Sequence, residues 1–526
     1  MTENVYLKQS VVAEPLFNQW YAWSYLISPA TAAMYTANSH LKIMRSFVSA
    51  PQVHVAALKN PAMIGGPFIN YDAKRAGEIS ELIGRTMKEQ SSLLELAEAL
   101  KTTDEMLQTE ANGHSLESLY QKIPDVLKGY VELVYDLNNH PCLRLIEGLL
   151  YRSPYYNPDA QSVSLFIGDE EKRPFALSSP NLLGSGQIQV RAPFNAEVYD
   201  ELFKMKYEPR PIGYIKELLN IEEKDAELFS SFFTEEAPPP PAQYTGEDVR
   251  VRYFGHACVL VETKEVSILC DPVISYQCDG GVCRYTYADL PEQIDYVLIT
   301  HNHQDHCMFE TLLQLRHKIK NIIVPRNNAG SLVDPSLKLV LKSIGFENVH
   351  AMDEVESINV PGGTITALPF MGEHGDLDIR TKAAYLINLK GKSVLCAADS
   401  NNIEPKLYKH IHDLAGNVDV VFLGMECDGA PLTWLYGPLL TKPLARKMDQ
   451  SRRFDGSDYA KGMNLINQLN PSQAYVYAMG QEPWLKFLTS IQYTEQSRPI
   501  VESNKLVEHC SGQGIVAERL FGQKQI

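Results

Sequence analysis

Four potential metal ligands stand within six residues directly after an apolar run, and no other feature constrains the fold of this chain as strongly. The apolar run is Tyr296-Val-Leu-Ile299, and the ligands are His301, His303, Asp305 and His306. A short run of branched and aromatic residues without a polar break predicts a buried strand. The His-x-His-x-Asp-His loop at the C-terminal end of that strand brings three imidazoles and a carboxylate together. It predicts a metal site on a rigid strand end.

Two later loops offer further ligands, and each follows a short apolar strand. Glu373 and His374 lie in the first loop, after Leu368, and Asp399 follows the run that begins at Val394. Together with the first loop, this order and spacing resemble the metallo-β-lactamase superfamily. The resemblance implies an αββα sandwich that holds two neighbouring metals, with a further ligand from the first of these loops and a bridging aspartate at Asp399.

The chain departs from the hydrolases of that superfamily at two points. Where a hydrolase usually presents a histidine, this chain offers Glu373 beside His374, and a carboxylate makes the site harder and favours iron over zinc. The final histidine of the hydrolases is also missing, because the strand Ala474–Met479 ends without one and the only later histidine is His509. A hydrolytic zinc pair would have too few ligands.

With both departures, the chain resembles the di-iron β-hydroxylases of nonribosomal peptide biosynthesis, which have the metallo-β-lactamase fold. The chloramphenicol-pathway β-hydroxylase is of this kind. The resemblance implies that a large N-terminal domain, used for dimerisation and for contact with the carrier and its substrate, precedes the catalytic domain. It also implies two iron ions, with Glu373 and Asp399 as catalytic carboxylates. The implied ligands are His301, His303, Glu373 and Asp399 for one iron, and Asp305, His306 and Asp399 for the other.

Five further residues are candidates for supporting the metals or contacting the substrate. Asp271 resembles the strand-end aspartate of the superfamily, which steadies the ligand loop by hydrogen bonds more often than it binds metal directly. His256 could face the metals, but the sequence does not decide its role. His374 is the alternative to Glu373 as a ligand. Glu426 and Asp428 either add carboxylates to the site or only solvate their loop.

The chain divides at four consecutive prolines, Pro238 to Pro241, which hold an extended segment and cannot donate to a helix or a sheet. We expect an α/β protein with a mixed α/β domain at 1–235, a linker at 236–248 and the αββα sandwich at 249–526. Within the first unit, apolar spacing predicts helices over 76–99 and 115–137. Alternation predicts strands near 162–167 and 187–191.

Charge and hydropathy exclude several classes of partner. The formal net charge of −16 argues against nucleic acid, whose phosphates need a basic face. No apolar stretch is long enough to span a bilayer, and the start, Met1-Thr-Glu-Asn-Val5, lacks a basic region followed by an apolar core. We expect a cytoplasmic protein that contacts neither nucleic acid nor membrane.

The resemblance implies an oxygen-dependent monooxygenase that hydroxylates the β-carbon of an amino acid held as a thioester on a peptidyl-carrier domain of a nonribosomal peptide synthetase. No flavin, nicotinamide or iron–sulfur motif is present, so two electrons must come from a separate reductase or ferredoxin-like donor. The resemblance further implies a homodimer.

Two alternatives stay open at this point. One is a dinuclear zinc or manganese hydrolase of the metallo-β-lactamase superfamily acting on a lactone, phosphodiester or thioester, which His374 would support as a ligand. The other is a metal-bearing scaffold whose N-terminal domain is the working part.

Overall fold

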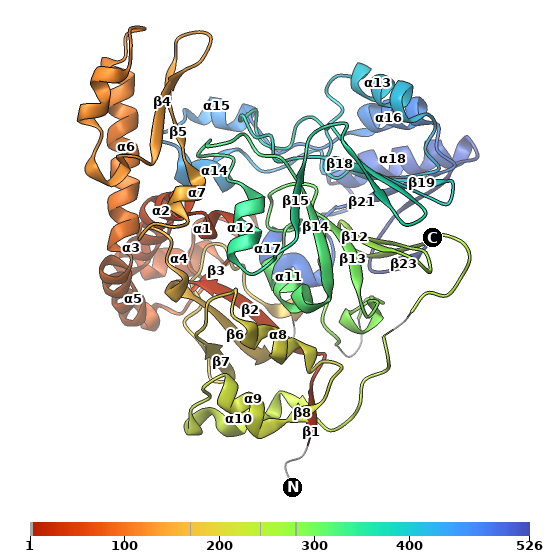
Figure 1. The fold of residues 1–526 in the computed structure, drawn as a ribbon, viewed down its shortest axis with the longest axis horizontal. Helices are drawn as coiled ribbons and strands as arrows, with labels where there is room; N and C mark the ends of the chain where they lie inside the picture. Colours follow the sequence, from red (N-terminus) through yellow and green to blue (C-terminus); the bar gives the residue numbers. More distant parts are fainter. Residues whose placement is uncertain (1–3, 169, 242, 279–280) are drawn as a thin grey trace.

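Two seven-stranded sheets lie face to face in the C-terminal half of the molecule (Figure 1). The structure, a computed structural model, describes residues 4–168, 170–241, 243–278 and 281–526. The first sheet has the order β15-β14-β13-β12-β11-β10-β23, and the second has the order β16-β17-β18-β19-β20-β21-β22. The strands of the first sheet are β10 (Arg250–Gly255), β11 (Cys258–Glu262), β12 (Ser267–Cys270), β13 (Ile294–Leu298), β14 (Ile319–Pro325), β15 (Val349–Met352) and β23 (Lys524–Gln525). Those of the second are β16 (Ser357–Val360), β17 (Gly363–Leu368), β18 (Ala384–Leu389), β19 (Lys392–Cys396), β20 (Val420–Gly424), β21 (Gln473–Tyr477) and β22 (Val516–Arg519).

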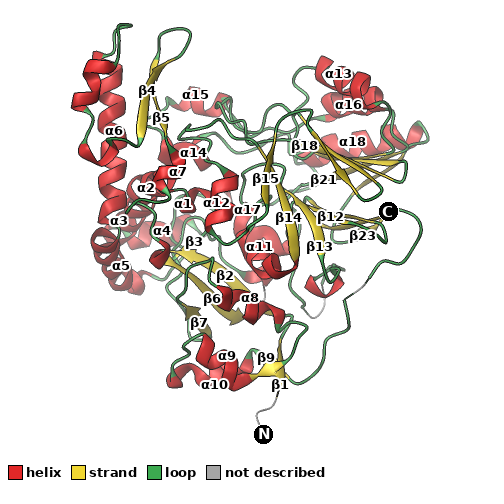
Figure 2. Ribbon diagram, in the orientation of Figure 1, coloured by secondary structure: helices red, strands yellow, loops and turns green. Residues whose placement is uncertain are grey.

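Apolar side chains fill the space between the two sheets, and helices cover their outer faces (Figure 2). Val261, Ile268, Ile387 and Phe422 belong to the inner core. The second sheet is covered by α13 (Lys406–Ala415), α16 (Tyr459–Leu469) and α18 (Arg498–Gly512), whose apolar residues share a core with that sheet. The helices α11 (Phe309–Leu315) and α12 (Leu337–Ser343) pack on the first sheet. Three short helices, α14 (Thr433–Tyr436), α15 (Arg446–Ser451) and α17 (Lys486–Thr489), lie in the loops.

The N-terminal half is a mixed α/β unit. The predicted fold, a mixed α/β domain followed by an αββα sandwich, is therefore confirmed. Its central sheet has the order β3-β2-β6-β7, formed by β2 (Val11–Phe17), β3 (Trp20–Tyr21), β6 (Gln161–Ile167) and β7 (Gln187–Val190). A small sheet joins β8 (Arg210–Pro211), β1 (Asn4–Leu7) and β9 (Phe233–Thr234), and β4 (Val131–Tyr135) pairs with β5 (Pro141–Leu145). The helices are α1 (Ser24–Ile27), α2 (Pro29–Tyr35), α3 (Leu41–Ser49), α4 (Pro51–Ala57), α5 (Ala76–Glu89), α6 (Ser91–Glu110), α7 (Glu147–Leu150), α8 (Glu197–Lys204), α9 (Ile212–Leu218) and α10 (Ala226–Ser231).

One predicted helix is wrong. The segment 115–137 forms a 3₁₀ turn at Glu117–Lys122, a second one at Asp125–Leu127, and then strand β4. Pro124 accounts for the interruption, because proline has no N–H to donate and disfavours a helical residue before it. Beyond it, Val131 and Leu133 are buried while Glu132 between them is exposed, which is the alternation of a strand.

The two halves share one hydrophobic core. Val12 and Phe17 of the N-terminal sheet belong to the same cluster of buried residues as Leu260, Leu269 and Val297 of the first sandwich sheet. Between Thr234 and Arg250 the described residues form neither helix nor strand. The predicted domain bounds, 1–235, 236–248 and 249–526, stay a prediction. The two halves pack through a common core, so the packing does not mark where one domain ends and the next begins.

A buried ion-pair cluster fastens the halves to each other. Arg173 Nη1 lies 2.8 Å from Glu310 Oε1 of α11, and Nη2 lies 2.6 Å from Glu14 Oε2 of β2. The guanidinium also lies over the ring of Phe487, 3.6 Å from its centroid. The Glu310 side chain is 0% exposed, so its charge depends on Arg173 and on the Tyr276 hydroxyl that donates to it.

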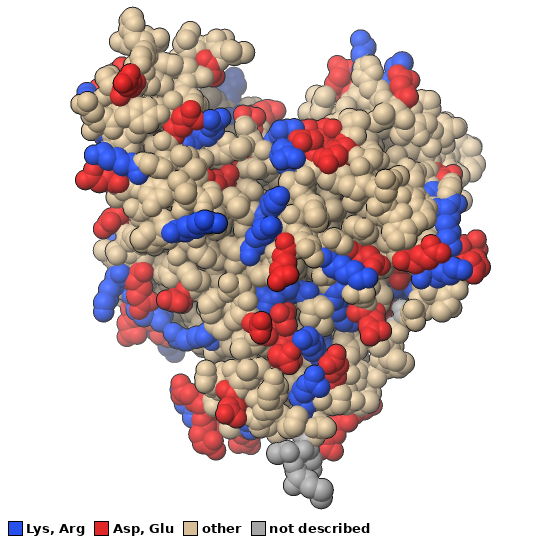
Figure 3. All heavy atoms as spheres, in the orientation of Figure 1, with Lys and Arg blue, Asp and Glu red and all other residues tan. Residues whose placement is uncertain are grey.

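Lysine and arginine alternate with aspartate and glutamate over the face seen in Figure 3, without an extended basic surface there. Among the described residues, no helix combines the length and the apolarity needed to cross a membrane.

We predict that Arg173→Met lowers the melting temperature markedly, because Glu310 would then stay buried without its cation. Breaking such a buried pair costs about 3–5 kcal/mol. The matched control is Arg380→Met, whose pairs with Asp353 and Glu354 are about two-fifths exposed. That change should cost less than about 1 kcal/mol. Thermal unfolding followed by circular dichroism compares the two variants, and equal shifts would contradict this account of the interface.

Candidate metal centre

Buried imidazoles and carboxylates converge where β13 ends. Three groups of side chains each place one donor atom of every member within 4.8 Å of the others, a spacing that could hold a metal ion. The groups are His301, His303 and Glu373; His301, His306 and Asp399; and His256, Asp305 and His306. His301 and His306 are fully buried, and His303 is 6% exposed. All six residues expected to bind metal therefore lie in one cluster, together with His256.

Glu373 reaches the first histidine pair from the loop after β17. Its Oε1 lies 3.1 Å from Nδ1 of His303, and that nitrogen is 3.1 Å from Nε2 of His301. Glu373 adopts a positive φ of 69°, a conformation that is uncommon for a residue with a side chain. His374 belongs to none of the three groups; its ring packs 4.8 Å from that of His303. Glu373, and not His374, therefore shares a donor group with the two histidines, although the His374 ring packs beside them.

Asp399 lies between the two histidine positions of the ligand loop. Its Oδ2 is 3.1 Å from Nε2 of His306 and 3.7 Å from Nε2 of His301, while its Oδ1 is buried without a hydrogen-bond partner among the described residues. A glycine at 424 leaves room for this carboxylate, because a Cβ there would lie 2.6 Å from Oδ1. Asp399 therefore faces both His301 and His306.

Asp271 orients the ligand loop by accepting three hydrogen bonds. Its Oδ1 accepts from the backbone N–H of Thr300 at 2.7 Å, and its Oδ2 accepts from the Thr300 hydroxyl at 2.5 Å and from Nδ1 of His306 at 2.7 Å. With Nδ1 donating, Nε2 of His306 keeps its lone pair for the site. The Thr300 oxygen can in turn accept from Nδ1 of His301, 3.0 Å away. Thr300 was not predicted as a site residue, although it stands directly before His301.

His256 faces the site with the opposite tautomer. It occupies a tight turn between β10 and β11 at a φ of 51°. Its Nδ1 accepts from the backbone N–H of Gly480 at 3.2 Å, so the proton of the neutral ring lies on Nε2, which is 3.4 Å from Oδ2 of Asp305. A protonated Nε2 has no lone pair for a metal. His256 is therefore placed to steady Asp305.

Two of the remaining candidates differ in position. Glu426 lines the same cavity as His303, Asp305, Glu373 and Asp399, about 150 Å³ in volume. Asp428 is exposed and lies 3.3 Å from a guanidinium nitrogen of Arg453, so the structure does not bring it to the site.

Tyr436, the last residue of α14, also reaches the site. Its hydroxyl lies 2.9 Å from Nε2 of His303, which leaves Nδ1 of that ring facing Glu373. This contact was not predicted from the sequence.

The electrostatics of the site favour a cation. Burial raises the pKa of Glu373 well above its usual range, and the negative charges of Asp399 and Glu426 raise it further. Burial also raises the pKa of Glu426 to about 8 and lowers that of His303 to about 4. Crowded carboxylates repel one another, and metal ions would relieve that repulsion. The donor set of carboxylates and imidazoles fits iron.

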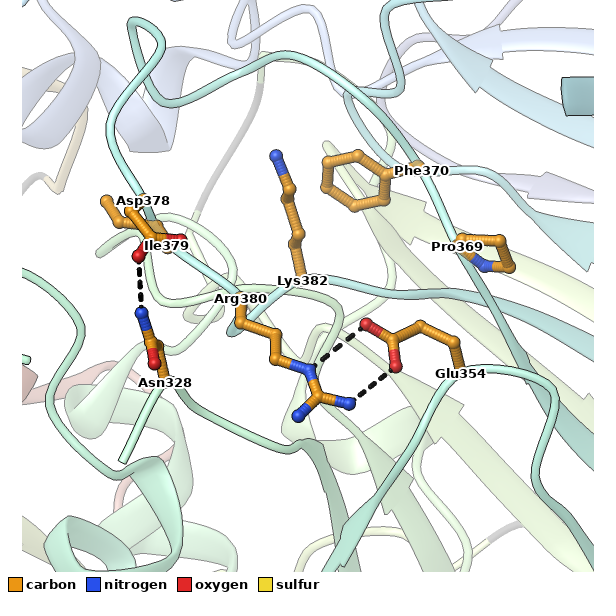
Figure 4. A pocket seen from close by; sticks show the side chains of 8 residues that line it. All are labelled: Asn328, Glu354, Pro369, Phe370, Asp378, Ile379, Arg380 and Lys382. Carbon is orange, nitrogen blue, oxygen red and sulfur yellow. Dashed lines mark hydrogen bonds and ion pairs between the residues drawn. The ribbon is translucent and has the colours of Figure 1, made fainter. Parts of the chain in front are cut away.

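A separate hollow is lined by Pro369 and Phe370, which follow β17, and by Arg380 and Lys382 (Figure 4). Its volume is about 430 Å³, and its polar groups pair with one another: Arg380 with Glu354, and Asn328 with Asp378. Lys382 donates to the carbonyl of Gly372 at 3.0 Å. None of the residues that line this hollow belongs to the three donor groups.

We predict that Asp271→Asn weakens metal binding by about 10–100-fold, the usual effect of removing a partner that orients a ligand. An amide cannot accept from Thr300 and His306 with both of its ends, so His306 loses its fixed tautomer. Metal content after dialysis against a graded series of chelator measures the effect. Asp295→Asn is the matched control, because Asp295 links the opposite ends of the same two strands by accepting from Ser267. Equal metal loss in both variants would contradict the assignment.

Comparisons with known proteins agree with this architecture. Residues 6–238 match the model of the diiron non-heme beta-hydroxylase N-terminal domain, and residues 250–434 match a beta-lactamase superfamily domain. A 4-amino-L-phenylalanyl-[CmlP-peptidyl-carrier-protein] 3-hydroxylase from Streptomyces venezuelae is 40% identical over 523 residues, covering 98% of each chain.

The solved structures point the same way. The crystal structure of CmlA, a diiron beta-hydroxylase from Streptomyces venezuelae, superimposes with a TM-score of 0.94 at 38% identity and covers 100% of both chains. A mutant of CmlA gives a TM-score of 0.92, also at 38% identity, over 99% of both chains. With such identity along nearly its whole length, the chain belongs to the diiron non-haem β-hydroxylase family.

Proposed function

We propose that this protein hydroxylates the β-carbon of an amino acid held as a thioester on a peptidyl-carrier domain of a nonribosomal peptide synthetase. The relative that is 40% identical over 98% of this chain is a 3-hydroxylase of an aminoacyl group on a peptidyl-carrier protein. The main support for the proposal is that Glu373 lies in one donor group with His301 and His303. This carboxylate adds oxygen to the donor set, which favours iron.

Two iron ions fit the residues that converge at the site. We assign His301, His303, Glu373 and Asp399 to one iron, and Asp305, His306 and Asp399 to the other. The three donor groups support this division, since Asp399 lies between His301 and His306. When bound, the iron pair supplies the reductive activation of dioxygen that hydroxylation of an unactivated carbon needs.

The residues of the chain orient these ligands and limit access to them. Asp271 and Thr300 fix the rings of His306 and His301, and His256 steadies Asp305. Tyr436 and Phe454 pack against His303, and both are buried. Apolar walls of this kind exclude bulk water from the reacting groups.

The reaction places one atom of dioxygen in the C–H bond and reduces the other to water with two electrons and two protons. A separate reductase or ferredoxin-like protein is proposed as the donor of these electrons. A homodimer and a cytoplasmic location remain predictions from the sequence.

The hydrolase alternative loses its main support. It depended on His374 as a ligand, and His374 lies outside every donor group among the described residues. The family membership favours the hydroxylase as well.

We predict that Glu373→Ala loses iron, whereas His374→Ala retains it, because only Glu373 shares a donor group with the two histidines. Iron and zinc are counted by mass spectrometry in protein purified without added metal, and the wild type should hold two irons per chain. Iron loss from His374→Ala alone would overturn the ligand assignment.

The activity itself is tested with amino acids loaded on a carrier domain, dioxygen and a chemical reductant. We expect a product heavier by one oxygen atom, located at the β-carbon by fragmentation. The same amino acids in free form serve as the control and should react much more slowly. Equal reaction of free and loaded amino acids would refute carrier tethering, and zinc in both positions without oxygen-dependent chemistry would restore the hydrolase.

A further inference from the structure

A second cavity, here called the aromatic cavity, lies beside the cavity that contains the metal ligands. Its volume is about 350 Å³, and the rings of Trp20, Trp23, Tyr35, Phe175 and Trp434 line it. Most of its wall comes from the N-terminal half, and the rest comes from residues 431–438 of the sandwich. None of the proposed metal ligands lines the aromatic cavity.

The two cavities meet at Trp434 and Leu435, which line both of them. The indole N–H of Trp434 donates to the carbonyl of Gly65 at 3.0 Å. A Cβ at Gly65 would lie 2.3 Å from Oγ of Ser490, and Ser490 lines the metal cavity. The three residues Gly65, Trp434 and Ser490 therefore form the junction between the aromatic cavity and the metals.

One residue that lines the aromatic cavity, Pro67, is exposed at the surface. No residue that lines the metal cavity belongs to the exposed class. A substrate attached to a large carrier must enter with its reactive end first, while its tether extends back to the surface. The cavity with the exposed lining residue is the one that suits the tether.

The walls combine apolar rings with unused hydrogen-bonding capacity. Trp20 and His40 stack with their centroids 3.9 Å apart, and neither Nε1 of Trp20 nor Nδ1 of His40 has a partner among the described residues. Burial lowers the pKa of His40 to about 3, so its ring is neutral. A long chain of methylene groups and secondary amides matches such walls, since its amides can pair with ring nitrogens and its carbons with ring faces.

Resting on the proposed function, we propose that the aromatic cavity binds the pantetheine arm of the loaded carrier and that Trp434 stands where the arm joins the amino acid. The thioester then lies at the junction, and the amino acid occupies the smaller cavity beside the metals. The N-terminal half thereby contributes directly to substrate positioning.

Intrinsic fluorescence gives a test that needs no turnover. Three of the four tryptophans of the chain, Trp20, Trp23 and Trp434, line the aromatic cavity. Pantetheine without an amino acid should change the tryptophan emission of the iron-loaded wild type in a saturable manner. The double variant Ser39→Phe/Ile43→Phe, which adds two rings to the wall of the cavity, should lose this change. Val53→Phe, at a position 59% exposed on the neighbouring helix α4, is the control and should keep it.

Turnover measurements show whether the pantetheine arm or the amino acid side chain occupies the aromatic cavity. We expect the wild type to prefer an aminoacyl pantetheine thioester over the aminoacyl ethyl thioester by about tenfold or more in kcat/KM, equivalent to about 1.4 kcal/mol of binding. The double variant should lose this preference, keep its rate with the ethyl thioester and retain its iron content.

Three results would overturn the proposal: no saturable fluorescence change in the wild type, an unchanged preference in the double variant, or equal loss with both thioesters. The last result would place the amino acid side chain in the aromatic cavity. If the wild type hydroxylates no thioester and no carrier-loaded amino acid, the proposed function fails. The fluorescence titration still decides whether the cavity binds pantetheine.

Discussion

The carboxylate of Asp271 is the contact on which the metal centre most depends. It is fully buried at the end of β12, and its three hydrogen bonds begin the ligand loop at Thr300 and fix the ring of His306. An ionised carboxylate without such partners is costly to bury, so the aspartate and the loop stabilise each other. These hydrogen bonds consequently tie the start of the ligand loop and the ring of His306 to the end of β12.

The N-terminal half completes this site from outside the sandwich. The hydroxyl of Ser24 donates to the side chain of Asn302 within the ligand loop, and the hydroxyl of Tyr35 donates to the carbonyl of Leu435 on the cavity wall. Both contacts are buried, and both tie the helices that follow β3 to elements that line the metal cavity. The large N-terminal unit is thus part of the active-site structure.

The sequence predicted the parts of this protein that local patterns determine. The strand before His301 and the ligand loop followed from a short apolar run and the spacing of the ligands, and the αββα class followed from the superfamily resemblance that those ligands carry. The role of His256 could not be predicted, because its tautomer depends on Gly480, more than two hundred residues away. The helix expected over 115–137 failed because the apolar spacing was given more weight than Pro124. Asp428 could not be separated from Glu426 until Arg453 was seen beside it.

The common core of the two halves has a consequence for how such proteins diverge. Residues of β2 pack in one cluster with residues of β11, β12 and β13, and Arg173 bridges carboxylates from both sides. Volume and charge at this contact can change only in compensating steps, because a lone substitution leaves a void or an unpaired ion. Variation in the N-terminal half and in the sandwich should therefore be correlated along descent. A chimera that joins halves from two relatives would have to take both faces of the contact from the same parent.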